Sequence, residues 1–206
     1  MTFAIIFAGL FLITIGMYFY KKDWSLLARR TLFYVHASSL FLLLVDIVLI
    51  INISTSFKTV WSDRVVAIIF FISGALVFAL NKKKLNLWAK VYFGTFFFYP
   101  LVVPFTFLID RLFFFIVASP LIGILSIPEV YYSDSKYDIR SMNGFMAPSR
   151  VVLIKKSLFT EKEIGKSDEG SVGSGNYKML RVIAQNHDST KVEVCYNGQI
   201  INYTFR

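Results

Sequence analysis

The sequence predicts a membrane protein, with an α-helical bundle of about five transmembrane helices followed by a small C-terminal antiparallel β domain of about four strands. Three observations predict this fold class. Of 206 residues, 56% are hydrophobic and only 17% are charged, whereas about a quarter of a typical soluble chain is charged. Apolar runs recur between short charged interruptions as far as residue 131, and an Asn-Gly pair separates two strand-like runs near the C-terminus. This composition excludes a disordered chain, and the single cysteine excludes a disulfide framework.

Apolar runs of helical length fill residues 1–131. A bilayer core of roughly 30 Å requires about 20 helical residues, and backbone polar groups in hydrocarbon are satisfied within helices. We therefore expect spans at about residues 2–20, 31–53, 62–81, 90–109 and 111–128. The last two come from one apolar stretch, Val91–Ile127, and we place a tight turn at its only charged pair, Asp110-Arg111. Alternatively, this stretch is a single span with a re-entrant piece, which would put the C-terminal domain on the other side of the membrane.

Lysine and arginine residues are concentrated in alternate connections of the bundle. Eight of the eleven in residues 1–131 fall in the first and third connections, namely Lys21, Lys22, Arg29, Arg30, Lys82, Lys83, Lys84 and Lys90. The positive-inside rule then predicts an N-terminus outside and, with five spans, a cytoplasmic C-terminal domain. The bias toward Phe, Ile and Lys suggests a bacterial inner membrane. This basic excess needs no nucleic acid to explain it, although the same side chains are candidates for binding anionic lipid head groups.

The sequence becomes more polar near residue 132. Residues 132–149 predict a connector, and residues 150–206 predict the β domain, whose strands we expect at Arg150–Leu158, Lys178–Gln185, Lys191–Tyr196 and Gln199–Arg206. Between the first two strands, Lys162–Asn176 is rich in glycine and predicts a loop. A domain of about 57 residues has a marginal core. We therefore expect it to rest on the membrane, on a second copy of the chain or on a partner.

The last two strands predict a β-hairpin with a defined register. Asn197-Gly198 stands alone between them, and Asn-Gly favours the type I′ turn that matches the twist of a hairpin. A two-residue turn pairs Tyr196 with Gln199, and the same register carries along both strands. The alternating apolar residues then share one face, so we expect a core formed by Val192, Val194, Ile201, Tyr203 and Phe205.

Two polar residues of the second span are candidates for a functional site. Asp46 interrupts an apolar run, where a carboxylate costs about 2.5–3.5 kcal/mol to insert and usually faces a bundle interior or a water cavity. Its functional interpretation is an ion or proton path, and the alternative is a packing residue bonded to Ser73 or Thr95. His36 precedes it by ten residues, or about 15 Å along a helix. The two therefore cannot form a catalytic pair within one helix.

The motif search favours a non-enzymatic protein. The sequence has no CxxC, HExxH, GxSxG, P-loop or GxGxxG motif, so we expect no metal and no cofactor. The first hypothesis is a subunit or assembly component of a membrane complex, a homo-oligomer or a hetero-complex, whose β domain contacts a partner. The alternative is an oligomeric pore or channel-like effector gated through the C-terminal domain. An intramembrane enzyme is disfavoured, because no two polar residues are spaced to cooperate.

Overall fold

The computed structural model describes residues 2–20, 24–53, 55–57, 62–125, 128–142, 150–167, 177–185, 189–196 and 199–205. These contain five helices and eight strands. The chain divides into two compact units. One comprises Met1–Val45 and Asp63–Ser126, and the other comprises Asp46–Ser62 and Ile127–Arg206. The first unit is helical and the second holds the strands, so the structure has the helical and β parts that the sequence predicts.

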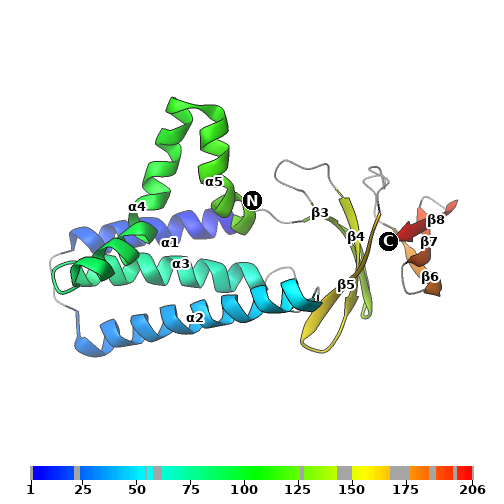
Figure 1. The fold of residues 1–206 in the computed structure, drawn as a ribbon, viewed down its shortest axis with the longest axis horizontal. Helices are drawn as coiled ribbons and strands as arrows, with labels where there is room; N and C mark the ends of the chain where they lie inside the picture. The colour runs from blue at the N-terminus through cyan, green and yellow to red at the C-terminus, as the bar shows by residue number, and fades with distance from the viewer. Residues whose placement is uncertain are drawn as a thin grey trace. The chain divides into compact units, whose positions relative to one another are not determined.

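The helical part of the chain contains five helices. They are α1 (Thr2–Phe19), α2 (Leu26–Ile53), α3 (Ser62–Asn81), α4 (Leu87–Ile109) and α5 (Arg111–Leu125) (Figure 1). By length and composition α2, α3 and α4 could each cross a membrane, whereas α1 and α5 are shorter apolar helices. The 15 residues of α5 extend about 22 Å, which is less than a bilayer core of about 30 Å.

Aromatic packing holds the helices together. The buried face of α1 repeats every three or four residues through Phe3, Phe7, Phe11 and Thr14, as expected of one face of a helix. On this face Phe7 meets Phe71 of α3 at 5.5 Å between ring centroids, and Phe11 meets Phe97 of α4 at 6.1 Å. Residues 71–75 and 77–79 of α3 are all buried, so α3 is the most enclosed of the helices.

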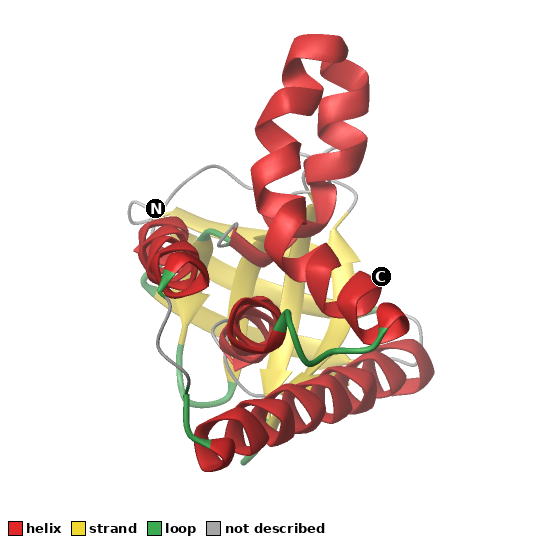
Figure 2. Ribbon diagram, turned by 90° about the vertical axis from the view of Figure 1, so that its left-hand side faces the viewer, coloured by secondary structure: helices red, strands yellow, loops and turns green. Residues whose placement is uncertain are grey.

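The last two helices form a hairpin that turns away from the others. Figures 1 and 2 show the first part of α4 close to α1 and α3, while its second part and α5 project together away from them. Pro100 and Pro104 lie inside α4, where each removes a backbone hydrogen bond and bends the helix. The hydroxyl of Tyr99 donates to the carbonyl of Val117 and so ties the two arms of the hairpin.

Asp110 makes the turn of this hairpin without a glycine or a proline. It is the C-cap of α4 in an extended conformation, with φ −158° and ψ 140°, and its N–H donates to the carbonyl of Thr106. Its carboxylate Oδ1 also accepts from the N–H of Phe113 at 2.9 Å, as an N-cap of α5 does. One short acidic side chain therefore both ends one helix and starts the next.

The β unit has eight strands where the sequence predicts about four. A five-stranded sheet has the order β1-β5-β4-β3-β2, and a three-stranded sheet has the order β6-β7-β8. The strands are β1 (Thr55–Phe57), β2 (Val130–Ser133), β3 (Tyr137–Met142), β4 (Arg150–Lys156), β5 (Thr160–Ser167), β6 (Met179–Gln185), β7 (Thr190–Tyr196) and β8 (Gln199–Phe205). Two of the extra strands, β2 and β3, overlap the predicted connector, and β5 takes the start of the predicted loop.

The remaining extra strand, β1, comes from the connection between α2 and α3. It pairs antiparallel with β5, about a hundred residues further along the chain, and places Thr55 opposite Lys162. All pairings in both sheets are antiparallel. A segment that follows α2 directly is therefore part of the C-terminal sheet.

The two sheets share one core. Ile139 and Leu153 of the larger sheet pack with Val192, Val194 and residues of the hairpin's second strand. The N–H of Tyr177 donates to the carbonyl of Tyr131 at 3.0 Å, which joins the β2 edge to the segment that leads into β6. The predicted hairpin register is confirmed, with Tyr196 opposite Gln199, Val194 opposite Ile201 and Val192 opposite Tyr203. The Asn197-Gly198 turn itself lies outside the described residues.

Candidate functional site

His36 lies where three helices meet. The residue is 3% exposed. Its Nδ1 lies 3.0 Å from the carbonyl of Phe70 and 3.2 Å from Ser73 Oγ, both on α3, and its Nε2 lies 3.0 Å from the hydroxyl of Tyr92 on α4. A neutral imidazole protonated on Nδ1 satisfies this set, because it donates to the carbonyl of Phe70 and accepts from Tyr92. The ring thus joins α2, α3 and α4 through hydrogen bonds, which we call the His36 cluster.

Aromatic rings enclose the His36 cluster. Phe70 stacks on the imidazole at 4.6 Å between centroids, and Phe93 and Phe96 meet it edge-on at 5.2 Å. Gly74 allows this close approach, because a Cβ built on it would lie 2.8 Å from the ring of Phe96 and 3.0 Å from Cε1 of His36. The cluster is therefore a packed polar contact between helices.

Asp46 is also buried, at 5% exposure, ten residues after His36 on α2. The sequence suggested Ser73 or Thr95 as its partner. Ser73 donates to the carbonyl of Phe70 and contacts His36, and Thr95 donates to the carbonyl of Val91. His36 and Asp46 belong to different compact units of the chain.

A second buried polar cluster lies in the five-stranded sheet. Arg140 of β3 binds Glu161 of β5 in a two-pronged ion pair, with Nη1–Oε1 at 2.6 Å and Nη2–Oε2 at 2.9 Å. Arg140 also pairs with Asp138, whose other oxygen is 2.5 Å from Nζ of Lys156 on β4. We call these four residues the sheet ion cluster. Asp138, Arg140 and Glu161 are 2%, 5% and 6% exposed.

Nearby opposite charges stabilise the charged form of Arg140. Burial alone would lower the pKa of Arg140, but its hydrogen bonds and opposite charges outweigh this, first those of Glu161 and then those of Asp138. The pKa of Arg140 is therefore raised above its ordinary value. Sequence analysis did not find this cluster. The alternation of Asp138, Ile139 and Arg140 was its only signal, because it places two opposite charges on one face of a strand.

The predicted orienting residues gather at one end of the helical unit. Arg29 and Arg30 lie at the start of α2, Lys82 to Lys84 follow α3, and Lys90 lies in the first turn of α4. Arg30 and Lys84 line the same hollow, so the start of α2 lies beside the segment that follows α3. The predicted β core residues Val192, Val194, Tyr203 and Phe205 are buried, and Ile201 packs against them.

The described side chains offer no evident metal site. Within the described ranges, no three His, Cys, Asp or Glu side chains come together as metal ligands would. His187 and Asp188 lie outside those ranges. The polar side chains of the described residues therefore form two kinds of feature. One is a set of buried polar contacts that hold elements together, and the other is a group of basic residues at one end of the helices.

We predict that Glu161→Gln weakens the β domain much more than Glu163→Gln. Breaking a buried ion pair costs about 3–5 kcal/mol, so amide protection in β3–β5 should fall by about 100-fold or more in hydrogen exchange of the full-length protein. Glu163 is the matched control on the same strand, because its pair with Lys166 is partly exposed and is worth at most about 1 kcal/mol. Equal loss in both variants would contradict the structural role of the cluster.

We predict that Gly74→Ala destabilises the helical unit. The added methyl would press on Phe96 and His36, and overpacking of this kind costs about 1–3 kcal/mol. Unfolding by sodium dodecyl sulfate titration in micelles measures the loss. Gly9→Ala is the control, because a Cβ there meets nothing within 4 Å, and it should be neutral or stabilising. A Gly74→Ala protein as stable as the wild type would rule out the close packing at the His36 cluster.

The structure thus has three candidate sites. They are the His36 cluster between helices, the sheet ion cluster in the β unit, and the basic residues at one end of the helical unit. The first two hold secondary-structure elements together through buried polar contacts. The third leaves charged groups exposed. Comparison of the chain with models of known protein families, with curated proteins and with solved structures finds no match.

Proposed function

We propose that this chain is a non-enzymatic integral membrane protein, a subunit or assembly component of a membrane complex, whose β domain docks a protein partner. Three long apolar helices fit residence in a bilayer. The observation that carries the docking proposal is a pair of exposed apolar side chains at the tip of the β4–β5 hairpin. The complex would contain further copies of this chain or a different protein.

The hairpin tip presents Leu158 and Phe159 to solvent. They are 75% and 77% exposed, and they occupy the centre of a tight turn closed by a 2.7 Å hydrogen bond from the N–H of Ser157 to the carbonyl of Thr160. Turn positions usually hold Gly, Asn, Asp or Ser. Large apolar side chains on a short, hydrogen-bonded turn are pre-organised, and such anchors often dominate binding at interfaces.

A second apolar row lies on the outer face of the three-stranded sheet. Met179, Cys195 and Ile200 are register partners across its three strands. Met179 and Ile200 are 48% and 67% exposed. Their position on the face opposite the shared core makes this row an alternative contact surface, and it supplies a comparison site for the tip.

The pore alternative has less support in the geometry. A path for ions would place polar side chains against water. His36 is enclosed by aromatic rings and hydrogen-bonded to Tyr92. We therefore favour the interpretation of His36 as a contact between helices.

The pairing of β1 with β5 favours the orientation in which α4 and α5 together make one net crossing. The 28 residues of α2 extend about 42 Å, enough to place its two ends on opposite sides of a bilayer. The basic residues lie at its start, and β1 follows its end. Because β1 belongs to the C-terminal sheet, the β domain would lie on the side opposite the basic end. The bend of α4 at its prolines and the short α5 fit one net crossing.

This orientation differs from the cytoplasmic β domain that five spans predict. If the basic end faces the cytoplasm, then the N-terminus and the β domain both lie outside. With five full crossings, β1 and β5 would lie on opposite sides of the membrane and could not pair. We therefore propose an extracytoplasmic β domain on an inner-membrane protein, with its partner on that side.

We predict that Leu158→Ser combined with Phe159→Ser releases the partner. Truncating an apolar anchor typically costs about 2 kcal/mol or more, so the amount of partner that co-purifies from native membranes should fall at least about tenfold. Ile200→Ser is the control, because it removes an apolar side chain of comparable exposure from the other surface, and it should leave co-purification unchanged.

The identity of the contacted surface is tested by crosslinking in native membranes. A photo-reactive phenylalanine analogue in place of Phe159 should form a discrete protein adduct. Adducts to lipid alone would mean that the hairpin tip inserts into the bilayer, and they would overturn the docking proposal. A wild-type protein that purifies alone as a monomer would overturn it as well.

A further inference from the structure

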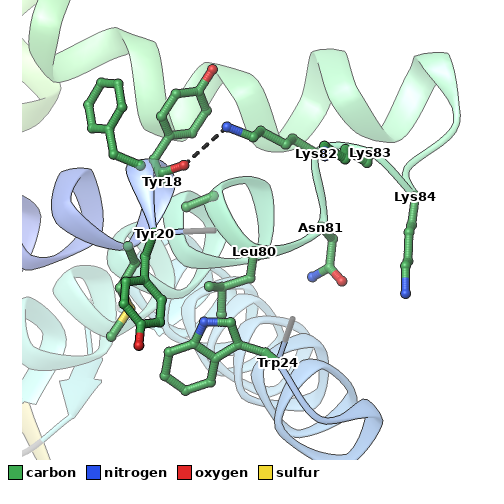
Figure 3. A pocket seen from close by; sticks show the side chains of 11 residues that line it. Tyr18, Tyr20, Trp24, Leu80, Asn81, Lys82, Lys83 and Lys84 are labelled. Carbon is green, nitrogen blue, oxygen red and sulfur yellow. Dashed lines mark hydrogen bonds between the residues drawn. The ribbon is translucent and has the colours of Figure 1, made fainter. Parts of the chain in front are cut away.

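Two hollows open at the same end of the helical unit, where α1 and α3 end and α2 begins. The larger, of about 570 Å³, is lined by the end of α1, Trp24 and the turn after α3 (Figure 3). The smaller, of about 430 Å³, is lined by the first turns of α2 and the end of α3. Asn81 and Lys84 line both. We therefore treat the two hollows as one site and call it the basic pocket.

The lining of the basic pocket carries charge of one sign. Its basic side chains are Arg29, Arg30, Lys82, Lys83 and Lys84, and the lining residues among the described ranges include no aspartate or glutamate. The charges come from two segments about fifty residues apart in the sequence. Arg30, Lys83 and Lys84 are exposed. An orientation signal requires these charges only on one side of the membrane, whereas here they converge on one hollow.

Lys82 is held in place at the edge of the pocket. Its Nζ donates to the carbonyl of Tyr18 at 3.0 Å and lies 3.4 Å from the centroid of the Tyr18 ring (Figure 3). It thereby satisfies a carbonyl at the C-terminus of α1, where the helix dipole favours a cation. Lys82 is therefore committed to the fold. Among the described basic residues of the lining, Arg30, Lys83 and Lys84 are exposed and can meet a ligand.

The walls of the pocket are apolar and aromatic. Tyr20, Trp24 and Leu80 line the larger hollow (Figure 3), and Leu26, Phe33 and Val77 line the smaller one. Tyrosine and tryptophan are enriched where a membrane protein meets the head-group region. Cationic groups above apolar walls suit a ligand that is anionic at one end and apolar at the other.

We propose that the basic pocket binds the phosphate group of an anionic phospholipid, with Arg30, Lys83 and Lys84 on the phosphate and an acyl chain along Phe33 and Val77. Basic hollows between membrane helices bind polyanionic head groups such as that of diphosphatidylglycerol. Each hollow has a volume within the range of sites for small ligands, about 300–1,000 Å³. A free phosphate ion could make the same ionic contacts, but it would make no contact with the apolar wall.

The proposal is tested by native mass spectrometry of the full-length protein in detergent, titrated with diphosphatidylglycerol. Lys83→Gln combined with Lys84→Gln should raise the apparent Kd about 25-fold, at about fivefold for each charge. Arg30→Gln, on the other segment, should raise it about fivefold. Both variants change exposed side chains, so the fold should persist, and unchanged thermal unfolding verifies this.

Lys90→Gln is the matched control. Lys90 lies at the same end of the helices and is exposed, but it lines neither hollow. It should change the apparent Kd less than about twofold, because only long-range charge is removed. If Lys90→Gln raised the apparent Kd as much as the paired lysine variant does, binding would depend only on general surface charge. That result would overturn the proposal of a lipid-binding pocket.

Two further ligands test whether the pocket binds a lipid head group or a free phosphate ion. Phosphatidylcholine, which carries a phosphate but no net charge, should bind at least tenfold more weakly than diphosphatidylglycerol. Inorganic phosphate should not displace the bound lipid at equal concentration. If inorganic phosphate binds as tightly as the lipid, the apolar wall contributes nothing and the lipid proposal is overturned.

Discussion

A buried polar group must be hydrogen-bonded, and this constraint decides how the helices meet. In the proposed bilayer setting, lipid would give the helices no hydrophobic reason to associate, so close packing and polar contacts would hold them together. His36 is the clearest case, because its two nitrogens reach α3 and α4 at once. Gly74 supplies the space for this contact and the aromatic rings close around it. These contacts connect α3 to α2, and His36 connects α2 to α4.

The same constraint governs the β unit. Arg140 is buried because Glu161 and Asp138 both neutralise it, and the ion pairs join β3 to β5 across the intervening strand. Ser56 of β1 lies 3.5 Å from the Glu161 carboxylate. The short strand that follows α2 is thus connected to the sheet through its backbone and, more weakly, through a side chain. This pairing links the topology of the helices to the side of the membrane on which the sheet lies.

Local sequence patterns predicted the helices and the last hairpin. They could not predict contacts between segments that are distant in sequence. The apolar runs predicted the helices, and Asn197-Gly198 with alternating residues predicted the register of the last hairpin, because each depends only on neighbours in sequence. The strand Thr55–Phe57 has three residues and a partner about a hundred residues away. No local pattern identifies such a strand. His36 was recognised as a candidate, but Tyr92 was not, since nothing in the spacing of α4 indicates which residue faces α2.

The central claim is that the β domain and the basic end of the helices lie on opposite sides of the membrane. Cys195 is the only cysteine of the chain and lies in the β domain, partly exposed. A second protein, with Cys195→Ser and Lys90→Cys, reports on the basic end. Labelling by a membrane-impermeant thiol reagent, before and after permeabilisation of intact cells, compares the two sites. We predict that Cys195 reacts in intact cells and that the thiol at position 90 reacts only after permeabilisation. Labelling of both sites under the same condition would contradict the account.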